Sequence, residues 1–277
     1  MKDSDQAVLI TGCSSGIGRA TAHLFAAHGW NVFATMRDPS KIGDLAPLPN
    51  VKVVRLDVTD TVSIESAVSQ VLAENAHVDV VINNSGLGAF GPFETATPAL
   101  VDRIVATNLT GVMNVIREIL PAMRMQRRGI IINVASVGGL TTMPLNAIYH
   151  ATKYAIVGFT EALIYELAPF GITAKTVMPG GVNTDFAGRS LSLTFHGDGH
   201  PYADEVASVK ATFANNGSTY SSSDDVAKTI FAAATDGTPR FKYVVGADAE
   251  TLLKARVDLG DEDYVNMMRE RFGLSKK

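Results

Sequence analysis

The feature that most constrains the fold of this chain is its alternation of short apolar runs with longer helical stretches. The runs are rich in β-branched residues, and most are apolar on both faces, as in strands that helices cover on each side. We expect strands at Ala7–Thr11, Asn31–Thr35, Val51–Leu56, Val78–Asn83, Ile130–Ala135, Ile172–Met178 and Lys242–Gly246. We expect helices at Gly16–His28, Val62–Asn75, Pro98–Arg128 and Tyr149–Pro169.

This alternation predicts a parallel sheet with right-handed crossovers. The predicted fold class is therefore α/β, a doubly wound parallel sheet of the Rossmann type with helices on both faces. No linker or change in composition divides the 277 residues, so we expect a single domain over residues 1–277. The segment "MRMQRRG" is expected to end one helix with a left-handed cap at Gly129.

Two segments depart from the regular alternation. Residues 186–223 form a long insert rich in Gly, Ser and His after a strand, where an open α/β sheet places its ligand contacts. We interpret this insert as a substrate-covering segment, with a disordered loop as the alternative. Residues 247–277 have a helical pattern, and we expect this tail to pack back on the domain.

Composition excludes several classes of protein. The net charge of −4 is opposite to the basic surface of a nucleic-acid-binding protein. A single cysteine excludes an internal disulfide and favours a reducing compartment. The first ten residues lack the apolar core of a signal peptide, and no run reaches the ~18 apolar residues of a membrane span. We therefore expect a cytoplasmic protein without a membrane span. His196 and His200 have no further ligands at a suitable spacing, so no metal site is expected.

The segment "TGCSSGIG" follows the first predicted strand and opens the first predicted helix. Its glycines, Gly12, Gly16 and Gly18, let the backbone turn sharply and let a pyrophosphate approach main-chain N–H groups at a helix N-terminus. The spacing differs from the usual G-x-G-x-x-G, and the lysine of a P-loop is missing, which argues against an ATPase. The segment predicts a nucleotide-binding site.

The end of the second predicted strand, "FATMRDP", bears on the choice of nucleotide. Dinucleotide folds that prefer NAD place an acidic residue here for the ribose 2′-hydroxyl, whereas an arginine accommodates a 2′-phosphate. Met36 stands at the acidic position and Arg37 follows it, while Pro39 is expected to turn Asp38 away. Ser14 offers a further hydroxyl contact. The pattern favours NADP(H), with Arg37 as a solvated surface charge as the alternative.

In "YHATK", Tyr149 and Lys153 stand four positions apart, so a helix places both on one face. Such pairs also occur on helix surfaces, so the spacing alone leaves a catalytic role open. Together with "TGCSSGIG", "NNSG", Ser136 and "PGGVNT", however, the pair resembles the motif set of the short-chain dehydrogenase/reductase family, in order and spacing, from Ala7 to Gly246. The segment "VFATMRD" and the segment "RFGL" near the end of the chain also resemble the sequences of the branch that contains hydroxysteroid and retinol dehydrogenases.

The resemblance implies a catalytic set of four residues. Tyr149 would act as the general acid in ketone reduction and as the base in alcohol oxidation. Lys153 would place a positive charge beside the phenol, favour phenolate, and hydrogen-bond the nicotinamide ribose. Ser136 would hydrogen-bond the substrate oxygen. Asn108 would hold a water that links Lys153 to solvent.

The resemblance also implies cofactor contacts. Asp57 would touch the adenine, Asn83 and Gly86 would line the ribose side, and residues 179–184 would flank the nicotinamide. The full expected set is Gly12, Ser14, Ser15, Gly16, Ile17, Gly18, Arg37, Asp57, Val58, Asn83, Ser85, Gly86, Tyr149, Lys153, Pro179, Gly180, Val182 and Thr184.

Two positions depart from the family pattern. Ser85 stands where alanine is more usual. Ser15 stands where some NADP-binding relatives carry a basic residue, so Arg37 supports the NADP(H) inference nearly alone, and NAD(H) stays open as the cofactor.

These features predict an oxidoreductase that transfers a hydride between NADP(H) and a ketone or secondary alcohol, with an apolar carbonyl substrate. The alternatives are an NAD-preferring dehydrogenase, a catalytically silent nucleotide-sensing regulator, and an epimerase or dehydratase on the same fold. A regulator is expected to lack the tyrosine or the lysine, and an epimerase to carry a larger C-terminal domain. The resemblance further implies a homodimer or homotetramer, joined through the helices predicted at residues 98–128 and 149–169.

Overall fold

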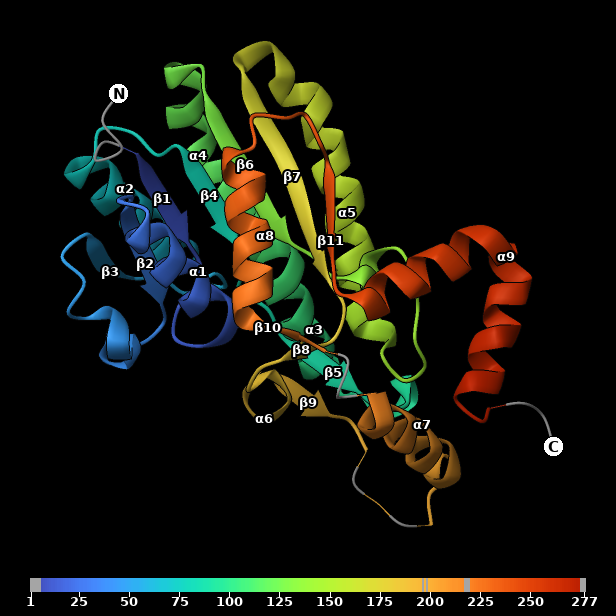
Figure 1. Cartoon of the computed structure of the whole chain (residues 1–277). Coiled ribbons are helices and arrows are strands. Elements are labelled where there is room, and N and C mark those ends of the chain that lie inside the picture. The colour runs from blue at the N-terminus through green and yellow to red at the C-terminus, as the bar shows by residue number, and fades with distance from the viewer. Residues whose placement is uncertain (1–5, 196, 198, 217–219, 275–277) are drawn as a thin grey trace.

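The computed structural model describes residues 6–195, 197, 199–216 and 220–274. A seven-stranded sheet forms the centre of the protein (Figure 1), and all of its strands run parallel. In spatial order its strands are β11 (Lys242–Val245), β7 (Ile172–Pro179), β6 (Gly129–Val134), β4 (Val80–Asn83), β1 (Ala7–Ile10), β2 (Asn31–Met36) and β3 (Val51–Arg55). The direction in which successive strands are added reverses between β1 and β4, as in a doubly wound sheet. The predicted fold class is confirmed.

Helices cover both faces of this sheet (Figure 1). Helices α1 (Gly16–Ala27) and α8 (Ser223–Thr235) share one hydrophobic core with the sheet. Helices α2 (Thr61–Glu74), α4 (Gly111–Gln126) and α5 (Ala147–Leu167) share the core on the opposite face. The sheet is therefore the middle of three layers, and its carboxyl edge stays open for other segments.

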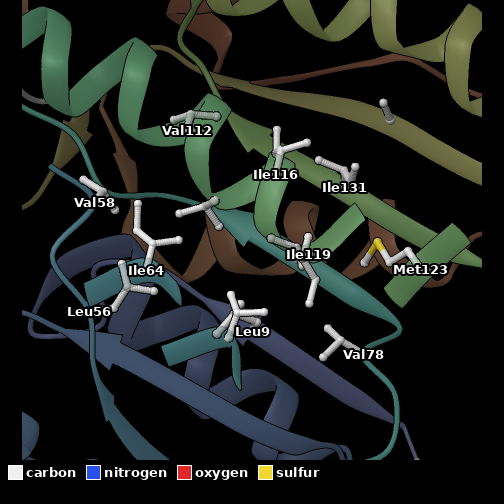
Figure 2. Close-up of a cluster of buried hydrophobic side chains, with 14 of the residues drawn as sticks. Leu9, Leu56, Val58, Ile64, Val78, Val112, Ile116, Ile119, Met123 and Ile131 are labelled. Carbon is white, nitrogen blue, oxygen red and sulfur yellow. The ribbon is translucent and has the colours of Figure 1, made fainter. Parts of the chain in front are cut away.

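The alternation of side chains along each strand builds these two cores. In β1, Ala7 and Leu9 belong to the core of α2, α4 and α5, whereas Val8 and Ile10 belong to that of α1 and α8. All four are fully buried, which explains why the strand is a continuous apolar run in the sequence. Figure 2 shows the first core, where Leu9 lies among aliphatic side chains from α2, α4 and β6. Each buried aliphatic side chain of this size stabilises the fold by roughly 1.5–3 kcal/mol.

The helix predicted at residues 98–128 contains an irregular turn. It consists of α3 (Pro98–Val105), a π-helical turn (Ala106–Thr110) and α4. By length and composition, Pro98–Gln126 is the one stretch in the described part of the chain that could cross a membrane. Its side chains Val115 and Ile119 are buried in the core beneath the sheet, and core helices meet the same criterion. This stretch is weak support for a span, and the expected absence of one stays a prediction.

The end of α4 differs from the expectation. Arg127 adopts the left-handed conformation, with φ of 53°, and closes the helix. The prediction of a left-handed cap at Gly129 was wrong, because Gly129 is already the first residue of β6. A Cβ on Gly129 would lie 2.7 Å from the sulfur of Met123. The glycine is needed for the close approach of strand to helix, and not for the turn.

The insert and the tail lie together beyond the carboxyl ends of the strands, at the bottom and right of Figure 1. The elements of this region are β5 (Gly88–Phe90), β8 (Val182–Asn183), α6 (Phe186–Arg189), β9 (Leu191–Leu193), α7 (Ala203–Asn216), β10 (Ser221–Ser222) and α9 (Ala247–Arg271). The insert pairs with the main body twice, β9 with β5 and β10 with β8, both in parallel. The tail contains the long helix α9, which is kinked at Gly260.

Candidate active site

A cleft of about 550 Å³ opens at the carboxyl edge of the sheet. Parallel strands end at the same edge, so the loops after β1, β2, β3, β4, β6 and β7 all reach this cleft. Among the residues expected to form the site, those that line the cleft are Gly12, Ser14, Ser15, Gly16, Ile17, Arg37, Asp57, Val58, Ser85, Gly86, Ser136, Tyr149, Lys153, Pro179, Gly180, Val182 and Thr184. Gly18, Asn83 and Asn108 are not among its lining residues.

The glycine loop leads from β1 into α1 at one end of the cleft. Gly12 and Gly16 have positive φ values of 77° and 55°, which favour glycine. A Cβ on Gly18 would lie 2.3 Å from the carbonyl oxygen of Gly12, so Gly18 supports the loop from behind without lining the cleft. Ser15 is the N-cap of α1, but its side chain makes no capping hydrogen bond. The first-turn N–H groups therefore remain available to an anionic ligand.

The loop after β2 places a cation at the same end. Arg37 is exposed and lines the cleft. The side chain of Asp38 instead accepts hydrogen bonds from the backbone N–H and the hydroxyl of Ser40, at 3.1 and 2.7 Å. These bonds lower the pKa of Asp38 and keep its carboxylate in its own loop. As expected from the sequence, Asp38 is turned away from the cleft.

Arg19 is a residue of this region that the sequence did not single out. Its Nη2 donates to the carbonyl oxygens of Ser14, at 2.7 Å, and of Lys41, at 2.9 Å. The guanidinium also lies 3.6 Å from a carboxylate oxygen of Asp44. Arg19 thereby joins the glycine loop to the segment that follows Arg37. An arginine on the first turns of a helix carries no local signal for such a contact.

At the floor of the cleft, one residue differs from the sequence prediction. Asn83 was expected to line the ribose side, but its side chain is buried and donates to Asn133 of the neighbouring strand, at 2.9 Å. The next residue, Asn84, lines the cleft and donates to the carbonyl oxygen of Thr11, at 2.9 Å. Successive strand residues point to opposite sides, so an offset of one position exchanges a cleft residue for a core residue.

Asp57 and Val58 lie where β3 ends. Oδ1 of Asp57 accepts hydrogen bonds from the backbone N–H and the hydroxyl of Thr59, at 3.0 and 2.8 Å. Both Asp57 and Thr59 line the cleft on the same side as Arg37. The loop therefore presents a fixed carboxylate at this end of the cleft.

Ser136, Tyr149 and Lys153 meet midway along the cleft. Oγ of Ser136 accepts a hydrogen bond from the backbone N–H of Gly138, at 3.0 Å, and also hydrogen-bonds Tyr149. Nζ of Lys153 donates to the carbonyl oxygen of Val134, at 2.9 Å, and lies 5.6 Å from the ring centroid of Tyr149. The helical spacing of tyrosine and lysine thus places both groups beside the serine from the end of β6.

The protonation of this group differs from the expectation. Burial raises the pKa of Tyr149, and the hydrogen bond with Ser136 opposes that effect without cancelling it. Burial also lowers the pKa of Lys153 from 10.5 to about 8. Lys153 was expected to favour the phenolate, but its ammonium faces the carbonyl of Val134. In the protein alone, burial therefore favours the neutral form of both side chains.

Asn108 lies in the π turn, next to the cleft. Its Nδ2 donates to the carbonyl oxygen of Leu87 and to Oγ1 of Thr152, at 2.8 and 3.1 Å, and its Oδ1 accepts from the N–H of Leu87, at 2.8 Å. The side-chain amide thus joins the loop that follows β4 to α5, the helix that carries Tyr149. The water-binding role implied by the resemblance stays a prediction.

His150, next to Tyr149, fixes the loop that follows Ser136. Its Nε2 accepts a hydrogen bond from the backbone N–H of Met143, at 2.9 Å. The neutral ring then carries its proton on Nδ1, which donates to the carbonyl oxygen of Gly138, at 2.8 Å. Burial lowers the pKa of His150, and the two backbone hydrogen bonds oppose that shift only in part. The imidazole is a neutral support for the serine loop.

The other half of the cleft has an apolar wall that the sequence did not reveal. Its side chains come from the insert, from α9 and from the loop between Ser136 and Tyr149. The apolar residues of this wall are Met143, Phe186, Leu191, Phe213, Leu252, Met268 and Phe272. They are scattered over more than a hundred positions and follow no motif, so only the folded chain shows that they face one space.

Cys13 and the histidines of the insert lie outside this chemistry. Cys13 is fully buried, and burial raises the pKa of its thiol to about 12, which makes it inert. Nδ1 of His200 accepts a hydrogen bond from the N–H of Tyr202, at 3.4 Å. His196 lies outside the described residues. Within the described part of the chain, no three His, Cys, Asp or Glu side chains form a group that could hold a metal ion.

The residues along the cleft fit a nicotinamide dinucleotide. The uncapped start of α1 provides N–H groups for phosphate oxygens. Gly12 is required there, because a Cβ would lie 2.9 Å from Oγ of Ser85. Thr184, from the loop after β7, approaches this glycine loop, since its methyl group would lie 3.6 Å from a Cβ on Gly16. The nucleotide end and the end with Tyr149 are thus parts of one continuous cleft.

Known proteins share this sequence and architecture. The family model described as short chain dehydrogenase matches residues 6–192. A 3-ketodihydrosphingosine reductase from Bacteroides thetaiotaomicron is 40% identical over 199 residues, which cover 72% of this chain and 72% of that protein. Retinol dehydrogenase 8 from Bos taurus is 36% identical over 200 residues, 69% of this chain and 64% of that protein.

Solved structures show the same relationship. A short-chain dehydrogenase from Streptomyces avermitilis superposes with a TM-score of 0.83 at 29% identity, covering 99% of this chain and 97% of that one. A 3-ketoacyl-(acyl-carrier-protein) reductase from Brucella melitensis, solved in complex with NADH, has a TM-score of 0.74 at 26% identity, with 88% and 98% of the chains covered. From its cleft, its motifs and these matches, the chain belongs to the short-chain dehydrogenase family.

Proposed function

We propose that this NAD(P)-dependent oxidoreductase transfers a hydride between NADP(H) and a ketone or secondary alcohol whose body is apolar. One observation carries the proposal. Ser136, Tyr149 and Lys153 meet in the cleft between the nucleotide-binding loops and the apolar wall. A carbonyl that binds beside Tyr149 would have the dinucleotide on one side and a hydrophobic surface on the other.

The side chains of the cleft have separate tasks in this reaction. A nicotinamide bound in the cleft supplies or accepts the hydride. The hydroxyl of Tyr149 gives a proton to the carbonyl oxygen in reduction, and its raised pKa keeps that proton in place until the oxygen becomes basic. Ser136 orients the same oxygen by a hydrogen bond. Lys153, buried beneath the tyrosine ring, supplies positive charge when protonated.

The preference for NADP(H) rests on the loop after β2. Arg37 lines the cleft, whereas the only acidic side chain of that turn, Asp38, is held by Ser40. An arginine whose adjacent carboxylate is bound within its own loop suits a 2′-phosphate. The carboxylate of Asp57, in the next loop, already accepts two hydrogen bonds from Thr59. The absence of a basic residue at Ser15 leaves NAD(H) as the alternative cofactor.

The apolar substrate is supported by the wall of the cleft. Phe213, Leu252 and Phe272 present two rings and an aliphatic group to the space beside Tyr149. Two relatives are named for 3-ketodihydrosphingosine and for retinol, both largely apolar molecules. A small polar carbonyl compound would leave most of this wall without a contact.

The proposal is tested by a panel of apolar ketones and secondary alcohols with NADP(H) and NAD(H), followed by the absorbance of the reduced nicotinamide. Turnover is expected on members of this panel. Tyr149→Phe is expected to lower kcat by roughly 10²–10⁴-fold, because the proton donor is lost, while the Kd of the dinucleotide stays similar. Tyr154→Phe, five residues further along α5 and exposed, is the matched control and should retain activity. Undiminished turnover by Tyr149→Phe would reject the assigned acid.

A further inference from the structure

The two glycines after β7, Gly180 and Gly181, are enclosed by residues from the last third of the chain. The family match ends at residue 192, so these enclosing residues belong to the part of the chain outside that match. The glycines begin the loop of residues 179–184, which we call the nicotinamide loop because the family resemblance places it at that end of the cofactor. Five of its residues line the cleft: Pro179, Gly180, Gly181, Val182 and Thr184.

Asp248, in the first turn of α9, contacts the nicotinamide loop directly. Its Oδ2 accepts a hydrogen bond from the N–H of Gly181, at 2.7 Å. A Cβ on Gly180 would lie 2.4 and 2.5 Å from the two carboxylate oxygens, and a Cβ on Gly246 would lie 2.5 Å from Oδ1. The carboxylate therefore fills the space that side chains on Gly180 and Gly246 would need. Asp248 also lines the cleft itself.

The second oxygen of this carboxylate is unusual. Oδ1 of Asp248 is buried and has no hydrogen-bond partner in the described part of the chain. Within the described part of the chain, this oxygen is therefore not held in place by a hydrogen bond of its own. Its place between Gly180 and Gly246 instead fixes the position of one backbone segment relative to the other.

The opposite side of the nicotinamide loop is covered by Tyr220 from the insert. A Cβ on Gly181 would lie 2.1 Å from Cδ1 of this tyrosine, so the ring packs directly on the glycine. The backbone N–H of Ser221 donates to the carbonyl oxygen of Gly181, at 3.0 Å. Burial raises the pKa of Tyr220, and the charge of Asp248 raises it further, which fits their position on either side of one short segment.

We propose that Asp248 is a positioning residue that joins the start of α9 to the nicotinamide loop and holds this loop in the conformation that binds the nicotinamide half of the cofactor. The same helix carries Leu252 and Met268, which line the apolar half of the cleft. Asp248 therefore connects the substrate wall to the cofactor loop. The inference rests on the proposed function only in that the bound cofactor is a nicotinamide dinucleotide.

The first test measures cofactor binding by calorimetry. Asp248→Ala is expected to raise the Kd of the intact dinucleotide on the order of tenfold or more, because a hydrogen bond to a charged acceptor is lost. The fragment without the nicotinamide is adenosine 2′,5′-bisphosphate if the protein prefers NADP(H), and AMP if it prefers NAD(H). Its Kd should stay within about twofold, since its contacts lie at the other end of the cleft. Asp248→Asn keeps an acceptor oxygen for Gly181 and should restore most of the affinity. Glu250→Ala, which removes another acidic residue from the same helical turn, is the matched control.

Equal weakening of the intact dinucleotide and of the fragment by Asp248→Ala would indicate general damage and overturn the proposal. So would an unchanged Kd for the intact dinucleotide, or a failure of Asp248→Asn to restore it.

The second test needs neither cofactor nor substrate. Amide hydrogen exchange of residues 179–184 is expected to become faster in Asp248→Ala than in the unmodified protein and in Glu250→Ala. Unchanged exchange in this segment would overturn the positioning role even if every variant remained folded. A protein that turned over no member of the ketone panel would reject the proposed function and leave the result of this measurement valid.

Discussion

Tyr149 and Lys153 lie side by side in the cleft, yet burial shifts their pKa values in opposite directions. The pKa of the phenol rises, because burial penalises its anion, and the pKa of the ammonium falls to about 8, because burial penalises its cation. In the unliganded protein, lysine is therefore the first of the two to change its charge as the pH rises above neutrality. The tyrosine keeps its proton throughout that range.

The pH dependence of cofactor use should show this order. Lys153 carries its charge below a pH of about 8 and loses it above, so the kcat/KM for the dinucleotide, which reports groups of the free enzyme, is expected to fall as the pH rises past about 8. In Lys153→Arg the charge persists at every accessible pH, and the alkaline decrease should disappear even if the activity is low. A profile of the unmodified enzyme that stays flat to about pH 10 would contradict the lowered pKa.

A single arginine is proposed to set the cofactor preference. Arg37→Asp should move the ratio of kcat/KM for NADPH over NADH toward NADH on the order of tenfold or more, because the cation is replaced by a carboxylate that suits a ribose 2′-hydroxyl. Arg55→Asp is the matched control, since Arg55 ends the neighbouring strand β3 and is exposed, but does not line the cleft. An equal change in both variants would show a general effect of charge and not a phosphate contact.

At the scale of elements, helix α5 has two different faces. One face carries Tyr149 and Lys153 to the cleft, and the other presents a stripe of small residues to the surface, Ala151, Ala155, Gly158 and Ala162. Two exposed tyrosines, Tyr154 and Tyr165, lie beside this stripe. Small residues let a second helix approach closely, and the predicted homodimer or homotetramer would place one there.

The predicted oligomer is tested at Gly158. A Cβ at this position would have no atom within 4 Å, so Gly158→Glu leaves the subunit undisturbed while it places a charge in the path of a partner helix. The molar mass from light scattering is expected to fall from that of a dimer or tetramer to that of a monomer. Gly158→Ala is the control and should retain the oligomer. A monomeric mass for the unmodified protein would remove the prediction.

At the scale of the whole molecule, a set of hydrogen-bonded polar side chains joins β7, the end of α8 and β11. Lys175 on β7 is fully buried, and its Nζ donates to Asp236 at the end of α8, at 2.8 Å, and to the hydroxyl of Tyr243 on β11, at 3.1 Å. The hydroxyl of Tyr243 donates in turn to Asp236, at 2.6 Å. Burial alone raises the pKa of Asp236, but the hydrogen bonds from Lys175, Tyr243 and Thr238 outweigh it and hold the pKa well below its usual range.

The stability of the protein should depend on this carboxylate. Because the folded-state pKa of Asp236 is lowered, its stabilising effect is fully present above the unfolded value near 4 and is lost as the pH falls toward the folded value. Asp236→Asn is therefore expected to lower the free energy of unfolding by ~3 kcal/mol near neutral pH and by clearly less at about pH 3, measured with urea. Asp258→Asn, which breaks the surface ion pair with Lys254, should cost less than ~1 kcal/mol at either pH. A cost for Asp236→Asn that does not change with pH would contradict the assignment.

Local patterns were sufficient for the architecture and for the placing of Tyr149 and Lys153 on one helix face. Runs of β-branched residues predicted all seven strands of the central sheet to within about two residues. A strand that helices cover on both faces is a continuous apolar run, and such a run can be recognised from neighbouring residues alone. The helical spacing of Tyr149 and Lys153, and the glycines after β1, follow from the geometry of one helix and one turn. These relations join residues close together in the chain, and any chain that forms the elements contains them.

Contacts between distant segments depended on how the elements pack. The hydrogen bond from Gly181 to Asp248 joins positions 67 residues apart, and the apolar wall combines Met143 with Phe272. No sequence pattern around these residues indicates which distant residue each one contacts. The sequence predicted that Asn83 faces the cleft, but Asn84 does so instead. This error has the same cause, because only the pleat of the folded sheet decides which of two successive side chains faces the cleft. Local periodicity thus sets the elements and brings Tyr149 and Lys153 to one helix face, whereas the shape of the proposed substrate space and the support of the nicotinamide loop arise from long-range packing.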